Sequence, residues 1–208
     1  MAKSYDNSVF INCPFDEGFK DIFYALVFTT YHCGFIPRCS LEENNATNNR
    51  LEKIKNLIGG CKYGIHDLSR IELNSELLPR FNMPFELGLF FGAQEYGTEH
   101  QKEKVALVLE REKFQSQKFL SDLSGIDTNA HNNETEKAIK IVRDWLKTSS
   151  NALSIPGHLT INNHYIDFTK NILPATVEKL GLVIYELTYN DYCQIVEEAM
   201  LTEFGMKN

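Results

Sequence analysis

The chain has 208 residues, which suits a single domain whose core needs neither disulfide bonds nor a structural metal. Its hydrophobic fraction of 43% and its aromatic fraction of 12% exclude the disordered and fibrous classes. The net charge of -7 is spread along the chain without a basic block, so binding to nucleic acid is not expected.

The cysteines and the N-terminus favour a cytoplasmic protein. Five cysteines without a C-x-x-C pair indicate reduced thiols rather than a disulfide framework or a zinc site, so no metal is expected. Residues 1–8 contain no apolar signal segment, and no later run is long enough to cross a membrane. We therefore expect no association with a membrane.

The chain begins with two short apolar runs on either side of a helical pattern. Ser8–Cys13 predicts a buried strand, which Pro14 ends. Apolar residues at helical spacing predict a helix over Phe19–Cys33. The run Phe35–Cys39 predicts a second strand, and its proline at position 37 favours the edge of a sheet.

The same alternation continues through the middle of the chain. The polar segment Glu42–Asn49 predicts a loop, and Leu51–Ile58 predicts an amphipathic helix. Lys62–Asp67 predicts a third strand, Arg80–Ala93 an apolar helix, and Lys104–Glu110 a fourth strand.

The last part of the chain is mainly helical. A short fifth strand is predicted at Phe119–Leu123, and a helix from about Asn133 to Leu146. Residues 151–208 show two helical patterns, and Thr188 with Asp191 resembles a capping box. We expect this tail to pack on the core or on a second subunit, and expect a homo-oligomer.

Strands that alternate with helices predict an α/β fold with a parallel sheet. We expect a flavodoxin-like sheet of four or five strands in the order 2-1-3-4-5 over residues 1–150, followed by a helical appendage over 151–208. Ligands of such sheets bind beyond the carboxyl ends of the strands, at the point where the strand order reverses. This rule places Asn12–Gly18, His66–Arg70 and the start of the Glu86 helix in one crevice.

Glu86 is the first candidate for chemistry because it is the only charged residue from Phe81 through Gln94. If Asn82 caps the helix, the helix dipole favours an ionised Glu86, which can act as a nucleophile or stabilise an oxocarbenium ion. The alternative is that Glu86 caps its own helix or pairs with Arg80 or Arg38.

Two further sites are suggested by polar groups at strand ends. Asp67, beside Ser69, can bind ribose hydroxyls or cap the following turn. His66 precedes Asp67 on a strand, so the two side chains point to opposite faces and form no relay. The turn after the first strand can hold phosphate through backbone N–H groups, and Phe15 can stack on a base or seal the core. Neither a Rossmann nor a P-loop motif is present.

Three segments of the chain resemble parts of one superfamily. Val9–Cys13 is similar to the first strand of Toll/interleukin-1 receptor (TIR) domains, and Gly64–Ser69 to a strand end of nucleoside 2-deoxyribosyltransferases. Met83–Gly88 resembles the helix that carries the catalytic glutamate in both families, which form one superfamily. Over residues 8–150 the chain resembles more closely a group of bacterial TIR-like proteins that share the Arg80–Gly88 stretch.

The resemblance implies a flavodoxin-like fold and cleavage of an N-glycosidic bond, with NAD or a related nucleotide as substrate and no cofactor. It makes Glu86 the catalytic residue and Asp67 a ribose or base contact, and it suggests a role in bacterial anti-phage defence. The expected substrate contacts are Asn12, Pro14, Phe15, Asp67, Ser69 and Asn82.

Three functions follow from these observations. The first is an NAD glycohydrolase or cyclase. The second is a binding module that senses a nucleotide or a protein partner without chemistry. The third is a nucleoside 2-deoxyribosyltransferase, which exchanges bases between deoxynucleosides.

Overall fold

The computed structural model describes residues 4–47, 49–70, 80–150, 152 and 154–206. At its centre lies a five-stranded parallel sheet in the order β2-β1-β3-β4-β5. The flavodoxin-like α/β fold and the strand order predicted from the sequence are thereby confirmed. The strands are β1 (Ser8–Asn12), β2 (Ile36–Arg38), β3 (Tyr63–Asp67), β4 (Val105–Glu110) and β5 (Thr128–Ala130).

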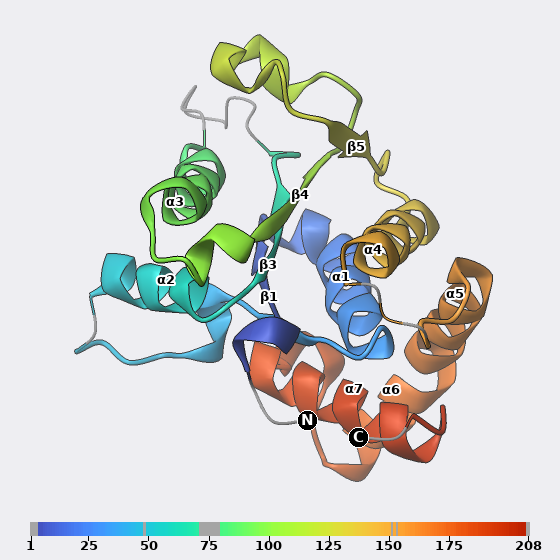
Figure 1. Cartoon of the computed structure of the whole chain (residues 1–208). Coiled ribbons are helices and arrows are strands. Elements are labelled where there is room, and N and C mark those ends of the chain that lie inside the picture. Colours follow the sequence, from blue (N-terminus) through green and yellow to red (C-terminus); the bar gives the residue numbers. More distant parts are fainter. Residues whose placement is uncertain (1–3, 48, 71–79, 151, 153, 207–208) are drawn as a thin grey trace.

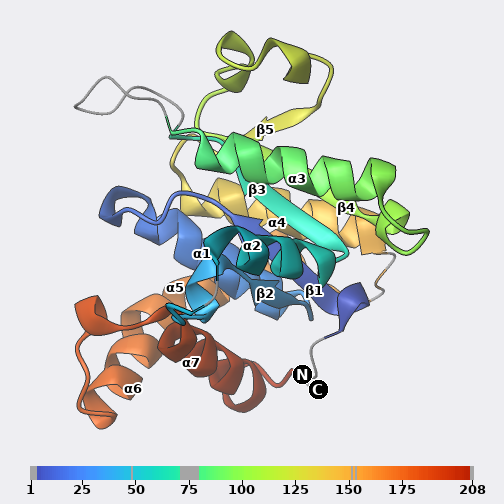
Figure 2. The same cartoon turned by 90° about the vertical axis from the view of Figure 1, so that its left-hand side faces the viewer.

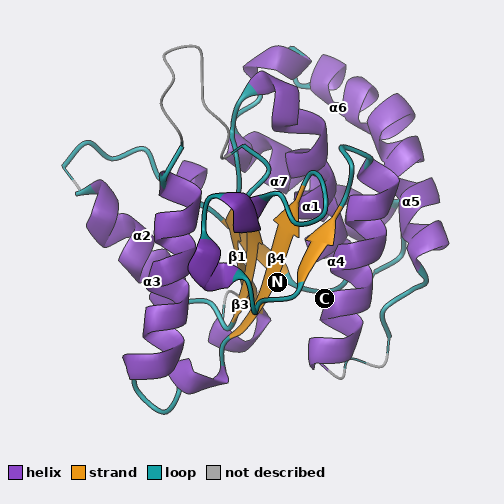
Figure 3. Cartoon of the chain, turned by 90° about the horizontal axis from the view of Figure 1, so that it is seen from above, coloured by secondary structure: helices purple, strands orange, loops and turns teal. Residues whose placement is uncertain are grey.

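Helices cover both faces of the sheet (Figure 1). Figure 3 shows α2 and α3 on one face and α1 and α4 on the other, with α5 to α7 outside the second layer. None of the helices in the described ranges has the length and apolar character needed to cross a membrane. The helices are α1 (Lys20–His32), α2 (Arg50–Gly59), α3 (Asn82–Tyr96), α4 (Thr135–Ser150), α5 (His158–Asp167), α6 (Leu173–Lys179) and α7 (Tyr189–Thr202).

The inner strands are buried on both sides, as a parallel sheet between two helical layers requires. All five residues of β1 and all five of β3 are buried. Gly64 in β3 lets α3 approach closely, because a Cβ at this position would lie 2.7 Å from a ring atom of Phe90. Phe90 follows Glu86 by about one helical turn. The contact at Gly64 therefore helps to fix the position of Glu86.

The fifth strand lies at Thr128–Ala130, and its prediction at Phe119–Leu123 was wrong. The predicted segment contains one short 3₁₀ turn (Ser121–Leu123), and Leu120 and Leu123 pack against the cluster around α3. The true β5 is short, polar and at the edge of the sheet, where no apolar alternation is needed.

The tail packs on α1 through α5 and α7 (Figure 2). The Tyr189 hydroxyl donates to the Pro37 carbonyl oxygen at 2.8 Å, and the Tyr189 ring stacks on Phe23 at 5.9 Å between centroids. Tyr192 stacks on Tyr24 at 3.8 Å. The predicted capping box at the start of α7 is confirmed. Aromatic contacts thus fasten α7 to the layer that covers the sheet.

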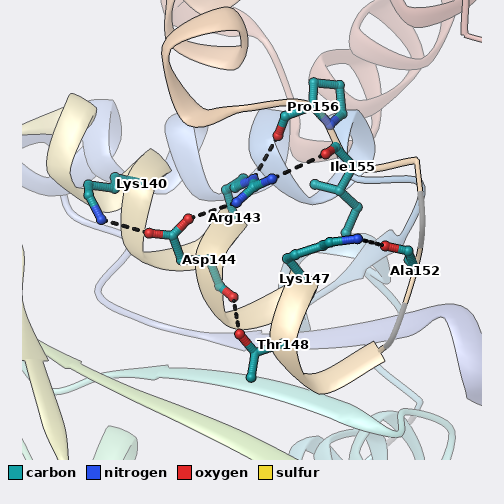
Figure 4. A network of polar contacts seen from close by, with 8 residues as sticks. All are labelled: Lys140, Arg143, Asp144, Lys147, Thr148, Ala152, Ile155 and Pro156. Carbon is teal, nitrogen blue, oxygen red and sulfur yellow. Dashed lines mark hydrogen bonds and ion pairs between the residues drawn. The ribbon is translucent and has the colours of Figure 1, made fainter.

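The connection from α4 to α5 is held by side chains of α4 (Figure 4). Arg143 donates from Nε to the Pro156 carbonyl oxygen at 2.6 Å and from Nη2 to the Ile155 carbonyl oxygen at 3.2 Å. Asp144 accepts from Arg143 at 3.0 Å, and Lys147 donates to the carbonyl oxygen of Ala152. These bonds fix the path of the chain where the tail begins.

Candidate functional site

A cavity of about 560 Å³ opens beyond the carboxyl end of β1, at the point where the strand order reverses. This volume lies within the range of about 300–1,000 Å³ that is typical of small-molecule sites. The end of β1, the start of α2 and the start of α3 contribute its walls. The described lining residues are Asn12, Cys13, Pro14, Phe15, Arg50, Arg80, Phe81, Asn82, Met83 and Glu86.

Glu86 lies in the wall of this cavity and is 7% exposed. Its carboxyl group forms no hydrogen bond or ion pair with any residue that the structure describes. Burial raises the pKa of Glu86 from 4.5 to about 7, although the charge of Arg50 lowers it. The carboxyl group therefore changes between its neutral and ionised forms near neutral pH.

The expectation that Asn82 caps α3 and keeps Glu86 ionised was wrong. Phe81 stands at the cap position without a side-chain bond, and Asn82 is the first residue of the helix. Pro84 has no N–H group to offer a cap, and the Phe85 N–H donates to the Phe81 carbonyl oxygen at 2.9 Å. Glu86 therefore lies beyond the unpaired N–H groups of the first turn, where burial outweighs the helix dipole.

Asn12 is held in one orientation at the end of β1. Its Nδ2 donates to the Met83 carbonyl oxygen at 2.9 Å and lies 3.0 Å from Nδ1 of His66. Because the amide nitrogen is a donor, Nδ1 accepts and the ring proton lies on Nε2. Burial and the charge of Lys104 lower the pKa of His66 to about 3, so the ring is neutral. Both amide hydrogens are used, which leaves the Asn12 Oδ1 as the acceptor for a ligand.

Phe15 forms an aromatic part of the cavity wall. The side chain is 39% exposed, and its ring meets Phe23 edge to face at 5.1 Å. Pro14 beside it is buried, whereas Asn82 across the cavity is exposed. A ring fixed at one edge and open to solvent can stack against a base. Phe15 thus meets the geometric requirement of the role predicted from the sequence.

Two arginines at the mouth of the cavity differ in their pairing. Arg80 forms an ion pair with Asp16 at 2.8 Å, and Asp16 also pairs with Arg70 at 3.2 Å. Arg50 is exposed and has neither an ion pair nor a hydrogen bond to a side chain in the described ranges. Arg50 was not predicted from the sequence as a binding residue, although it lies at the start of α2, beyond the carboxyl end of β2.

Asp67 and Ser69, expected to contact substrate, lie away from the cavity in a closed cluster with His131. Asp67 Oδ1 accepts from the Ser69 N–H at 2.9 Å, and Oδ2 lies 3.0 Å from Nε2 of His131. The Asn133 N–H donates to Nδ1 of His131 at 3.0 Å, so Nδ1 is an acceptor and the ring proton on Nε2 is directed at Asp67. All three side chains are at most 1% exposed. The cluster is therefore sealed from ligands.

The two faces of β3 explain this separation. His66 contacts Phe90 of α3 at 5.0 Å, on the face of the sheet that carries the cavity. Asp67 meets His131 on the opposite face, where Phe19 lies 6.0 Å from the His131 ring. The prediction that His66 and Asp67 diverge is confirmed, and Asp67 is not among the described residues that line the cavity. His131 follows a polar edge strand, and no pattern in the sequence identifies it.

No family model, curated protein or solved structure matches the chain. The described residues include no group of three or more histidine, cysteine, aspartate or glutamate side chains placed to hold a metal ion. All five cysteines lie in the described part of the chain, are buried and form no disulfide bond.

Proposed function

We propose that the protein binds a nucleotide in this cavity and cleaves its N-glycosidic bond, with Glu86 as the catalytic residue and NAD as the first substrate to test. The observation that carries the proposal is the position of Glu86, a buried carboxyl group without a partner among the described residues, in the wall of a cavity of ligand size. The resemblance to TIR-like proteins implies the same reaction.

The properties of Glu86 suit the charge that develops in this reaction. When the bond between ribose C1′ and a base breaks, C1′ becomes part of a positively charged oxocarbenium ion. An ionised Glu86 stabilises this charge or bonds to C1′. Because the wall excludes water from most of the side chain, the attraction is stronger than it would be in bulk water.

NAD is a substrate that needs no acid from the protein. Its nicotinamide carries a positive charge on the ring nitrogen, and this nitrogen takes the electron pair of the broken bond to leave as neutral nicotinamide. Water then adds its oxygen to C1′ and releases one proton, which the Glu86 carboxylate accepts and passes to solvent. The products are nicotinamide, ADP-ribose and a proton, so atoms and charge balance.

The other residues of the cavity provide binding rather than chemistry. Asn12 is held by Met83 and His66, so its Oδ1 can accept a hydrogen bond from a ribose hydroxyl without first being ordered. The exposed ring of Phe15 offers a surface on which a base can stack. Both groups lie in the same lining as Glu86.

The test is the release of nicotinamide from NAD by the purified protein and by Glu86→Gln. We expect the variant to lose at least roughly a thousandfold in kcat, since catalytic residues of this type contribute that much. Glu95→Gln, an exposed glutamate later in α3, is the matched control and should retain full activity. With Glu86 active as the carboxylate, kcat/KM, which reports the ligand-free protein, should rise about tenfold from pH 6 to pH 8.

The same assay, together with binding and base-exchange measurements, distinguishes the proposed reaction from the two other functions. Equal nicotinamide release by the protein and by Glu86→Gln would contradict the catalytic role of Glu86. Thermal stabilisation by nucleotides without turnover, at all protein concentrations up to those that favour self-association, would favour a binding module. Exchange between a deoxynucleoside and a free base would favour a deoxyribosyltransferase.

A further inference from the structure

Positive side chains outnumber negative ones in the lining of the cavity. Among the described lining residues, Arg50 and Arg80 are cationic, and Glu86 is the single acidic side chain. Because the pKa of Glu86 is about 7, its negative charge is only partly present at neutral pH. The cavity therefore favours an anionic ligand.

The two arginines are not equally available to such a ligand. Asp16 engages Arg80 at 2.8 Å, and it also holds Arg70, so a ligand would have to compete for Arg80. Other arginines of the chain are also engaged: Arg38 forms a two-pronged bond with Glu42, and Arg143 binds Asp144 and two backbone carbonyl oxygens. Arg50 has no comparable partner within the described ranges.

Arg50 and Glu86 share the cavity at some distance from each other. The charge of Arg50 acts on Glu86, yet the two side chains form no ion pair. A substrate whose C1′ lies at Glu86 carries its 5′-oxygen on the other side of the ribose ring. Any phosphate attached there is displaced from Glu86 toward another part of the lining, and a guanidinium group is the side chain that binds phosphate best.

We propose that Arg50 binds the phosphate on the 5′-carbon of the reacting ribose, so that the cavity selects nucleotides over nucleosides. This inference rests on the proposed function, because it places C1′ at Glu86. It names the substrate class for that reaction and excludes nucleosides as the preferred substrates. It also gives a role to an exposed side chain that forms no ion pair within the described ranges.

The experiment compares two ligands that differ by one phosphate, nicotinamide mononucleotide and nicotinamide riboside. Their dissociation constants are measured by calorimetry on Glu86→Gln, in which turnover does not interfere with binding. We expect the mononucleotide to bind at least about tenfold more tightly than the riboside, the usual gain from a charge-assisted hydrogen bond to phosphate. The difference should shrink as the salt concentration is raised.

The same measurements are made with Arg50→Gln added. This change should weaken the mononucleotide about tenfold and leave the riboside unchanged. Lys55→Gln is the control, because Lys55 lies on the same helix, is exposed and pairs with Glu52 at 2.5 Å. It should alter neither constant. Arg50→Lys, which keeps the charge but loses the planar fork, should give an intermediate affinity.

Three results would overturn the inference: equal affinity for the two ligands, an equal loss for both ligands in Arg50→Gln, or the same loss in Lys55→Gln. An unchanged melting temperature of Arg50→Gln confirms that the variant is folded. The proposed function is tested separately and would be contradicted by unchanged turnover in Glu86→Gln. If the protein bound the mononucleotide selectively but released no nicotinamide from NAD, the phosphate site would stand and the proposed reaction would be rejected.

Discussion

Two buried glutamates at the carboxyl edge of the sheet have opposite surroundings. Glu110, at the end of β4, is fully buried and accepts hydrogen bonds from the Phe114 N–H at 3.0 Å, the Ser116 N–H at 2.8 Å and the Thr128 hydroxyl. These bonds hold the pKa of Glu110 below its usual value, although burial raises it. Glu110 is thus a permanent anion that shapes the connection from β4 to β5.

Glu86 has no such bonds among the described residues, and burial raises its pKa. Both side chains leave water when the chain folds, but only Glu110 receives hydrogen bonds in return. Burial therefore does not distinguish a structural carboxylate from a candidate catalytic one, whereas the number of donors around it does. This contrast predicts different responses when each charge is removed.

The largest expected effect is that of Glu110→Ala. Two backbone N–H groups would lose their acceptor in a buried connection, and each such group costs about 1–3 kcal/mol. We expect the free energy of unfolding to fall by about 4 kcal/mol in urea titrations. Glu112→Ala, at an exposed neighbouring position, should change it by less than about 0.5 kcal/mol. A loss below about 1 kcal/mol in Glu110→Ala would show that its hydrogen bonds do not stabilise the fold.

The second prediction is that removing a charge raises the stability of the protein. The pKa of Glu86 is higher in the folded chain than its ordinary value of 4.5, so protonation favours folding. This contribution is fully present below about pH 4.5 and is lost as the pH rises through about 7. At pH 8, Glu86→Gln should therefore be more stable than the unmodified protein by up to about 3 kcal/mol.

At pH 3 the two proteins should be nearly equal in stability, because a Glu86 carboxyl with a pKa of 4.5 in the unfolded chain and about 7 in the folded chain is then largely neutral in both. Denaturant titrations at both pH values measure the difference, with Glu95→Gln as the exposed control. If Glu86→Gln were less stable than the unmodified protein at pH 8, Glu86 would be a structural carboxylate like Glu110, and the contrast between them would disappear.

The smallest expected effect belongs to Asp67→Asn. Asp67 uses one oxygen for the Ser69 N–H and the other for His131, and an asparagine can accept only one of these bonds with its single oxygen. We expect a loss of about 2 kcal/mol in the free energy of unfolding. Nucleotide affinity should not change, since Asp67 does not line the cavity. Weaker binding at unchanged stability would restore the substrate role first expected of Asp67.

Much of the fold could be predicted because the inner strands are mainly apolar and fully buried. A run such as Ser8–Cys13 is buried on both sides, and parallel pairing follows from the helices between the strands. The edge strand Thr128–Ala130 has no apolar signal and was missed. The nearby leucines of Phe119–Leu123 resemble a strand, yet they pack against the α3 cluster from a short turn.

The candidate site was predictable only in part. Glu86 could be identified because it is the single charged residue in an apolar segment. Asn12 is the last residue of the first strand and Phe15 follows that strand, so both lie at the switch point of the sheet. Whether Asp67 turned toward the cavity or toward the core depended on its partner His131, which is 64 residues away in the chain. Arg50 was missed because one arginine in a polar region gives no pattern that distinguishes it from a solvated surface charge.

The aromatic contacts of Phe15 extend beyond the cavity. Its ring touches Phe23, and Phe23 in turn stacks on Tyr189, the first residue of α7, whose hydroxyl is anchored on the edge strand. A continuous path of packed rings therefore runs from the tail to the wall of the cavity. If α7 were displaced, Phe23 would lose its stacking contact with Tyr189, and Phe15 would lose part of the packing behind it. We therefore expect changes in the packing of the tail to alter ligand binding at the cavity.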